Sequence, residues 1–222
     1  MINFVILASG EFPTKQQNID LLMNADKLIC CDGAVDDLVK YREPDYIAGD
    51  MDSISSENRE KFSNIIFPED EQEDNDLTKA IRLAIKIASE SSEPFYISIL
   101  GATGKREDHT LGNISLLARY NRMLKETFPS TANYIQMISD RGRFIPLDDS
   151  CEIETQIGTA ISIFATDPTL KISTQGVKYP TDEVVFDQWS WWKATLNVTT
   201  QKSVKFTFNH PCDVLVYIAS NI

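Results

Sequence analysis

Residues 46–53 read YIAGDMDS, a short apolar run that ends in a glycine and two aspartates. Runs this short, rich in β-forming residues and almost wholly apolar, are typical of strands buried in a parallel sheet. Five further runs in the first two thirds of the chain have this character and also end in polar clusters: Phe4–Ala8, Lys27–Cys31, Asn64–Phe67, Phe95–Leu100 and Tyr134–Ser139. The carboxyl ends of parallel strands meet at one edge of a sheet, where open α/β sheets bind ligands. The clusters, most of them acidic, are therefore expected to gather at that edge.

Helical patterns lie between several of these runs. The clearest has apolar residues at helical spacing from Leu77 to Ala88, and residues 74–76 (DND) offer three candidate caps for its first turn. A second helix is expected from near Thr110 to a point before Pro129. This alternation predicts an α/β domain with a Rossmann-like, mostly parallel, doubly wound sheet and helices on both faces.

The pattern changes near residue 140, after which no long helical period occurs. Short apolar segments alternate with turn residues, namely Cys151–Ile157, Thr159–Phe164, Lys171–Thr174, Ala194–Thr200, Val204–Asn209 and Val214–Ile218. This pattern predicts an antiparallel all-β domain, a small sandwich or barrel. The two domains are expected to comprise residues 1–142 and 143–222.

Composition narrows the class of protein. The 222 residues carry a formal net charge of −12, which disfavours nucleic acid and anionic membranes as partners. The first ten residues lack the basic region of a signal peptide, and no run approaches the roughly 18 apolar residues of a membrane span. The four cysteines show no CxxC spacing, so they are expected to be reduced thiols in a cytoplasmic protein.

Asp50 and Asp52 are the strongest candidates for metal ligands. Side chains two residues apart in an extended backbone point the same way, so these carboxylates would repel unless a cation or a proton lies between them. Magnesium fits because it binds carboxylate oxygens and keeps positions for water and substrate phosphates. The alternative is that one of the two merely caps a turn before a helix near Ser55–Phe62.

Three other clusters have the chemistry of a phosphate site. Asp32 and Gly33 form a tight turn between a strand and a helix, where the backbone can approach a ligand. Lys79 follows an acidic stretch one turn into a helix and is placed to meet a phosphate as a point charge. Residues 101–104 (GATG) form a glycine-rich turn whose N–H groups can cradle phosphate oxygens, and Arg106 can bind a phosphate through two nitrogens.

Together these clusters resemble the thiamine pyrophosphokinase family over nearly the whole chain. The matching stretches are CDGAVDDL (31–38), PDYIAGDMDSI (44–54), EDNDLTKAI (73–81), GATGKREDHTLGN (101–113) and KISTQGVKYP (171–180). The resemblance implies an enzyme that transfers the terminal pyrophosphoryl group of ATP to the hydroxyl of thiamine and releases AMP. It also implies a need for Mg²⁺ and a homodimer, with thiamine held between the α/β domain of one subunit and the β domain of the other.

The resemblance further implies roles for particular residues. The metal ligands would be Asp50, Asp52 and Asp76, with Asp32 near the metal or the thiamine. The phosphates would be met by Gln72, Thr78, Lys79 and Arg106. The nucleotide side of the pocket would be shaped by Thr103, Asp108, His109 and Asn113. Thiamine would be contacted by Asp32, Tyr179, Thr195 and Asn197. The catalytic set would combine the four aspartates with Lys79 and Arg106, and Asp32 or a metal-bound carboxylate would accept the alcohol proton.

Some positions depart from the family pattern. Tyr179 stands where the family often has tryptophan, and its ring can still stack on a cationic thiazolium. Leu196 stands where the family has a polar residue that bonds thiamine. This leaves open a Mg²⁺-dependent, nucleotide-using transferase with another small alcohol as acceptor. A non-catalytic nucleotide or thiamine sensor is the third reading.

Overall fold

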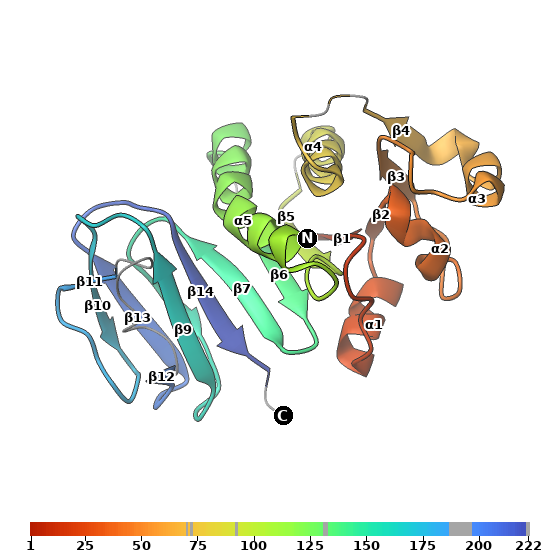
Figure 1. Cartoon of the computed structure of the whole chain (residues 1–222). Helices are drawn as coiled ribbons and strands as arrows, with labels where there is room; N and C mark the ends of the chain where they lie inside the picture. The colour runs from red at the N-terminus through yellow and green to blue at the C-terminus, as the bar shows by residue number, and fades with distance from the viewer. Residues whose placement is uncertain (70, 72, 92, 131–132, 187–196, 221–222) are drawn as a thin grey trace. The chain divides into compact units, whose positions relative to one another are not determined.

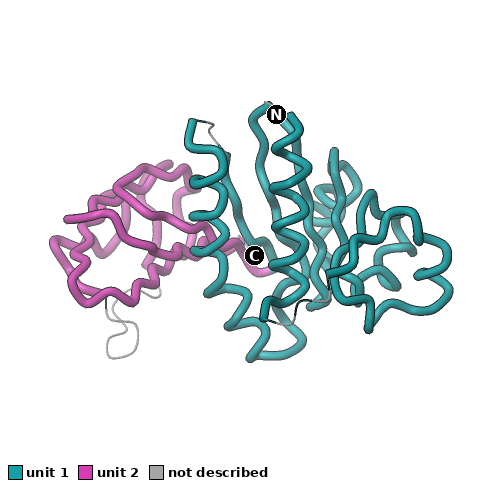
Figure 2. Tube along the Cα trace, turned by 90° about the horizontal axis from the view of Figure 1, so that it is seen from above, with its two compact units in different colours: residues 1–140 teal, residues 141–222 magenta. Residues whose placement is uncertain are grey.

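The computed structural model describes the chain except residues 70, 72, 92, 131–132, 187–196 and 221–222. The chain divides into two compact units, Met1–Asp140 and Arg141–Ile222, which Figure 2 draws in teal and magenta. The division falls close to the boundary expected at residue 142.

The first unit is built on a parallel sheet with strand order β6-β5-β1-β2-β3-β4 (Figure 1). These strands are β1 (Ile2–Leu7), β2 (Lys27–Cys31), β3 (Tyr46–Gly49), β4 (Ile66–Pro68), β5 (Phe95–Leu100) and β6 (Tyr134–Ser139). The helices are α1 (Gln16–Met23), α2 (Val35–Leu38), α3 (Ser56–Lys61), α4 (Asp76–Ser89) and α5 (Glu107–Thr127). All five strand pairings are parallel, so the predicted fold class is confirmed.

The order of the strands creates a switch point beside β1. The chain proceeds outward from β1 through β2 and β3 to β4, and then returns to place β5 on the other side of β1. Val5 consequently lies between Leu28 of β2 and Ser98 of β5. The connections that leave β1 and β5 diverge to opposite sides, which opens a crevice at the carboxyl ends of these two strands. A ligand site is expected there.

Helices cover both faces of this sheet. Leu22 of α1 and Leu38 of α2 are fully buried in one apolar cluster with Val5 and Leu28. Helix α4 contacts β1, β2 and β3, and α5 contacts β6. The stripe from Leu77 to Ala88 that the sequence predicts is buried except at Ile85, which is half-buried. Within the part of the chain that the structure describes, no helix has the length and apolar character needed to cross a membrane.

The structure selects one of the three expected caps of α4, and two element boundaries differ from expectation. Asn75 is the residue that caps α4, because its Oδ1 accepts the N–H of Thr78 at 3.0 Å. Helix α5 begins at Glu107 rather than near Thr110, so the acidic end of the GATGKREDH stretch is helical. A 3₁₀ turn over Ser63–Ile65 shifts β4 toward the carboxyl end of its expected range.

The second unit consists of two antiparallel sheets, with strand orders β12-β9-β14-β7 and β11-β10-β13-β8 (Figure 1). The strands are β7 (Gly142–Leu147), β8 (Cys151–Glu154), β9 (Ala160–Ala165), β10 (Lys171–Gln175), β11 (Val184–Val185), β12 (Asn197–Val198), β13 (Ser203–Phe208) and β14 (Val214–Ala219). Ile163 and Val216 from the first sheet share a buried core with Ile172 and Phe206 from the second. The predicted antiparallel all-β part is confirmed, although the sequence did not single out β7 and β11.

Candidate active site

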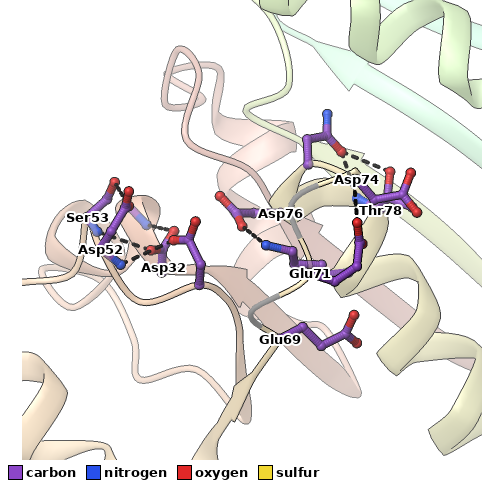
Figure 3. Close-up of polar contacts among 12 residues, drawn as sticks. Asp32, Asp52, Ser53, Glu69, Glu71, Asp74, Asp76 and Thr78 are labelled. Atoms are coloured by element: carbon purple, nitrogen blue, oxygen red, sulfur yellow. Dashed lines mark hydrogen bonds and ion pairs between the residues drawn. The ribbon is translucent and has the colours of Figure 1, made fainter.

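Three aspartates from two neighbouring loops meet at the carboxyl edge of the parallel sheet, and Figure 3 labels two of them, Asp32 and Asp52. Asp32 begins the turn after β2, and Asp50 and Asp52 follow β3. A carboxylate oxygen of each lies within 4.8 Å of the other two. Asp32 is buried, Asp50 is half-buried and Asp52 is exposed, so this aspartate cluster leads from the interior to the surface.

The turn after β3 brings Asp50 and Asp52 together by a different route from the one expected. The backbone between them is not extended, because Met51 has a φ of 66°. The N–H of Asp52 donates to Oδ1 of Asp50 at 3.2 Å, and the Ser53 hydroxyl donates to Oδ1 of Asp52 at 2.7 Å. Burial of Met51, which is 3 % exposed, anchors this left-handed turn in the apolar core beneath it.

Two backbone hydrogen bonds hold the Asp32 side chain in place, but its surroundings disfavour the ionised carboxylate. Its two oxygens accept the N–H groups of Gly33 at 2.7 Å and Ser53 at 3.2 Å. Burial raises its pKa above the ordinary value of 3.8, the carboxylates of Asp76 and Asp50 raise that pKa further, and the two N–H donors oppose the shift. A divalent cation would relieve the repulsion that this arrangement creates, so the residues present fit a hard, oxygen-binding metal ion.

Asp76 and Lys79 form a second charged layer beside the aspartate cluster. Asp76, the first residue of α4, lies outside the 4.8 Å group, although its carboxylate faces the side of Asp32 and acts on the pKa of that residue (Figure 3). The Lys79 ammonium lies 3.3 Å from Oδ1 of Asp76, and the Lys79 side chain is only 2 % exposed. A buried cation thus balances part of the negative charge at this edge.

A pocket of about 260 Å³ lies at the switch point between β1 and β5. Its lining comes from residues 8–10 after β1, from the stretch after β5 and from the first turns of α4 and α5. The backbone runs close here: a side chain at Gly10 would place its Cβ 2.4 Å from the carbonyl oxygen of Gly101, which itself has a φ of +65°. Cys31 and Asp76 also line the pocket, which joins it to the aspartate cluster.

An ion pair between Arg106 and Asp108 lies at the opening of this pocket. Arg106 donates through Nη2 at 2.6 Å and Nε at 3.1 Å to the two carboxylate oxygens of Asp108. This guanidinium, with a hydrogen bond from the N–H of His109, lowers the pKa of Asp108 to about 2. Both side chains are mostly exposed, so a phosphate can compete with Asp108 for Arg106. Thr103 and His109 line the pocket beside them.

A hydrogen-bond chain, which the sequence did not indicate, joins the walls of the pocket. The Thr78 hydroxyl is 2.8 Å from the Tyr120 hydroxyl and donates to Oδ1 of Asn75 at 2.9 Å. Asn75 donates to Asn113, whose Nδ2 donates to the carbonyl of Ala102 at 2.8 Å. Thr78 and Asn113 therefore hold α4, α5 and the turn after β5 together. In the structure the Thr78 hydroxyl is already hydrogen-bonded to two side chains. The predicted contact of Thr78 with phosphate stays a prediction.

A second set of missed residues anchors the acidic loop before α4. Asp74 accepts from Arg82 and from Arg119, each at 2.6 Å, and the Arg119 nitrogen comes from a residue 45 positions away. Arg82 also donates to Glu69 at 2.5 Å. These contacts position the loop that delivers Asp76. Gln72, in the same loop, lies outside the described residues.

Asp140 has a structural role and is not among the residues that line the switch-point pocket. It was expected among the clusters at the ligand edge because it directly follows β6. Its Oδ2 accepts the N–H of Thr14 at 2.7 Å, and its Oδ1 accepts Nδ2 of Asn18 at 2.8 Å. Asp140 thereby fastens the segment that leads into α1.

In the second unit, Tyr179 and Asn197 lie together. The Tyr179 ring is 61 % exposed, and Nζ of Lys178 lies 5.3 Å from its centre. The Asn197 side chain accepts the N–H of Tyr179 at 3.1 Å and donates to its carbonyl at 2.8 Å. Asn197 thus fixes the backbone of Tyr179. Thr195 and Leu196, which the sequence analysis singled out, lie outside the described residues.

Replacing Asp32 with asparagine is expected to raise the Tm of the metal-free protein at neutral pH. The folded state holds the Asp32 proton more tightly than the unfolded chain does, so the free energy of unfolding falls as pH rises from 3.8 through the raised pKa. The variant lacks this loss, which is expected to outweigh the one N–H acceptor that asparagine gives up at neutral pH, and its advantage should shrink toward pH 4. Thermal melts with a chelator at both pH values test this, and an advantage of equal size at both would contradict it.

The fold and the site define a doubly wound α/β protein whose carboxyl edge joins an acidic, cation-ready cluster to a glycine-rich pocket. Family models match both halves of the chain. The thiamin pyrophosphokinase catalytic domain matches residues 19–128, and the thiamin pyrophosphokinase substrate-binding domain matches residues 142–217. The chain belongs to the thiamin pyrophosphokinase family, and the predicted resemblance is confirmed.

Relatives of established name agree with this assignment. The chain is 40 % identical over 93 residues to thiamine pyrophosphokinase 1 of Oryza sativa subsp. japonica, a match that covers 39 % of this chain and 35 % of the rice protein. It is 30 % identical over 121 residues to thiamin pyrophosphokinase 1 of Caenorhabditis elegans, covering 52 % of this chain and 49 % of the nematode protein. The matches thus span half or less of the length of these relatives.

Solved structures show the same fold over the whole chain. Thiamin pyrophosphokinase from Candida albicans superposes with a TM-score of 0.78 at 16 % identity, covering 99 % of this chain and 90 % of that one. The yeast enzyme gives a TM-score of 0.79 at 14 % identity, covering 98 % and 86 %. At sequence identities this low, the structural similarity is evidence for the fold alone.

Proposed function

We propose that this protein transfers the terminal pyrophosphoryl group of ATP to the hydroxyl of thiamine, giving thiamine diphosphate and AMP. Residues 1–142 are the proposed nucleotide- and metal-binding domain, and residues 143–222 contribute to thiamine binding and dimerisation. The observation that carries the proposal is the junction of the aspartate cluster with the switch-point pocket, since Asp76 borders both. The reduced state of all four cysteines supports a cytoplasmic location.

The reaction needs one bond formed and one broken. The hydroxyl oxygen of thiamine attacks the β-phosphorus of ATP, the bond from that phosphorus to the α,β-bridging oxygen breaks, and AMP leaves. Negative charge on the phosphate oxygens is met by Lys79 and Arg106, because phosphoryl-type transfer depends mainly on positioning and charge neutralisation. The alcohol proton passes to a carboxylate, for which Asp32 is the candidate.

Magnesium is the proposed metal. Asp50, Asp52 and Asp76 are the proposed ligands, with Asp32 beside the ion, and the carboxylates of Asp32, Asp50 and Asp52 already lie within 4.8 Å of one another. The bound ion supplies charge neutralisation on the triphosphate. Carboxylate oxygens without thiol or imidazole donors favour Mg²⁺ over softer metals.

Product analysis tests the proposed reaction. The protein is incubated with ATP, thiamine and Mg²⁺, and the nucleotides and thiamine esters are separated. AMP and thiamine diphosphate are expected in equal amounts, and ADP as the nucleotide product would contradict the proposal. A panel of small alcohols scored by AMP release tests the alternative that another acceptor is preferred. Tight binding of ATP or thiamine with turnover at background level would indicate the sensor.

Replacing Tyr179 with alanine is expected to raise KM for thiamine about tenfold, since stacking of a cation on an aromatic ring contributes about 1–2 kcal/mol. The ammonium of Lys178 lies over this ring, 5.3 Å from its centre, which supports a cation-binding role for the ring. Tyr179→Phe keeps the ring and serves as the control. Steady-state kinetics should show little change in KM for ATP, and an equal rise in both KM values would rule out a stacking role.

The proposed dimer places the active site between subunits, and mixing two variants, each impaired at low thiamine, tests this. Asp52→Asn damages the first unit and Tyr179→Ala the second. If each site combines units from two subunits, half of the sites in a mixed dimer are intact, and an equal mixture should recover about a quarter of wild-type activity at low thiamine. Activity no higher than the average of the separate variants would place each site within one chain.

A further inference from the structure

Three side chains with different donor atoms meet in the second unit. Asp167 lies between β9 and β10, and His210 and Cys212 lie between β13 and β14. A carboxylate oxygen, an imidazole nitrogen and the thiol sulfur lie within 4.8 Å of one another. All three residues are half-buried, so the group is reachable from solvent.

The separations within this Asp–His–Cys group suit a tetrahedral metal. Oδ2 of Asp167 is 3.5 Å from Nε2 of His210 and 3.7 Å from Sγ of Cys212. Zinc bonds of about 2.0 Å to oxygen, 2.1 Å to nitrogen and 2.3 Å to sulfur, at tetrahedral angles, place such donors about 3.3–3.5 Å apart. The two separations from Oδ2 of Asp167 therefore lie within tenths of an ångström of those in a zinc site, and the imidazole nitrogen and the thiol sulfur lie within 4.8 Å of each other.

Hydrogen bonds already orient the ligand atoms. The other oxygen of Asp167, Oδ1, accepts the N–H and the hydroxyl of Thr169, both at 2.7 Å, which leaves Oδ2 turned toward His210 and Cys212. The N–H of Cys212 donates to the carbonyl of Asp148 at 2.9 Å. Outer hydrogen bonds of this kind are what hold metal ligands in position.

The two loops that carry the group are tied together by both sheets. Val214 pairs with Ala165 in one sheet, and Ile172 pairs with Phe208 in the other. Asn209 closes the gap between the loops, because its Oδ1 accepts the N–H of Lys171 at 2.7 Å and its Nδ2 donates to the carbonyl of Thr169 at 3.2 Å. The strand pairing and the hydrogen bonds of Asn209 therefore fix the two loops that carry the three donor atoms.

We propose that Asp167, His210 and Cys212 form a binding site for a zinc-type transition-metal ion, with one coordination position open to water. Thiolate and imidazole donors select zinc and its neighbours over Mg²⁺, so this site and the aspartate cluster would hold different metals. On binding, the Cys212 S–H bond breaks, a sulfur–metal bond forms and the proton goes to the buffer. The proposal does not depend on the catalytic function.

Cobalt titration of the full chain tests the site. The protein is freed of metal with a chelator and placed in saturating Mg²⁺, which occupies the aspartate cluster, and Co²⁺ is then added. A thiolate-to-cobalt charge-transfer band in the near ultraviolet, saturating at one ion per chain, is expected. Added Zn²⁺ should abolish the band, because zinc binds such sites more tightly than cobalt.

Matched variants locate the ligands. Cys212→Ser should lose the band, whereas Cys151→Ser, which alters a cysteine of the same unit outside the group, should keep it. His210→Ala should keep a weakened band, and Thr169→Ala should weaken binding about tenfold, as loss of an outer hydrogen bond does. Circular dichroism and Tm in the absence of metal check that each variant folds.

Two results would overturn the proposal. The first is a band that persists unchanged in Cys212→Ser, which would assign it to another thiol such as the buried Cys31. The second is the absence of any thiolate band in the folded wild-type protein up to millimolar Co²⁺. In that case the group is a local ion pair between Asp167 and His210 with Cys212 as a third hydrogen-bonding member.

Discussion

Replacing Asp52 with asparagine is expected to lower kcat at least about a thousandfold while leaving the fold intact. A catalytic metal ion supplies several kcal/mol of charge stabilisation, and each 1.4 kcal/mol or so is a factor of ten in rate. The carboxylate of Asp52 is exposed and accepts a hydrogen bond from its neighbour Ser53, a contact that asparagine can keep. AMP release measures the loss, and thermal melts with and without Mg²⁺ measure the fold and the metal.

Glu57→Gln is the matched control for this variant. Glu57 is an exposed acid in the first turn of α3, a few residues beyond the aspartate cluster. Like Asp52→Asn, Glu57→Gln removes one negative charge from this surface. Because Glu57 is outside the aspartate cluster, the substitution should leave both kcat and the Mg²⁺-dependent rise in Tm unchanged. If Asp52→Asn retained kcat within a factor of ten and kept that rise, Asp52 would not be a metal ligand.

The sequence was sufficient for the architecture because four strands of the first unit, β1, β2, β3 and β5, are buried on both faces. Such strands are short, β-rich and apolar throughout, so their limits are visible as changes in polarity. The expected bounds of β2, β5 and β6 agree with the structure, at Lys27–Cys31, Phe95–Leu100 and Tyr134–Ser139. Strands of the second unit are half-exposed, and β7 and β11, with mixed burial, gave a weaker pattern.

The side-chain partners of the site could not be predicted in the same way. Asp140 and Asp32 both follow a strand of one sheet, but Asp140 binds the segment before α1 while Asp32 faces two other carboxylates. Pairs such as Arg119 with Asp74 and Tyr120 with Thr78 join residues more than 40 positions apart. No local periodicity carries such information, because these contacts depend on how helices pack.

Replacing Lys79 with methionine is expected to reduce kcat about a hundredfold or more and to lower stability as well. The ammonium lies 3.3 Å from Asp76 and is almost wholly buried, so its loss leaves a carboxylate without its cation beside the aspartate cluster. Removing one member of such a pair costs about 1–3 kcal/mol, with Asp76 partly exposed to water. Thermal melts without metal should show the loss, and Mg²⁺ should recover part of it.

A double variant separates the structural role of Lys79 from its catalytic role. Lys79→Met combined with Asp76→Asn removes both charges, so the repulsion is gone and the Tm without metal should return toward that of the wild type. Transfer should remain as slow as in Lys79→Met or become slower, because the proposed phosphate-binding cation is still missing and Asp76, itself a member of the proposed catalytic set, has lost its charge. If the double variant recovered kcat together with Tm, Lys79 would serve only to neutralise Asp76. The phosphate charge would then be met by Arg106 and the metal, and the buried lysine would be a positioning residue.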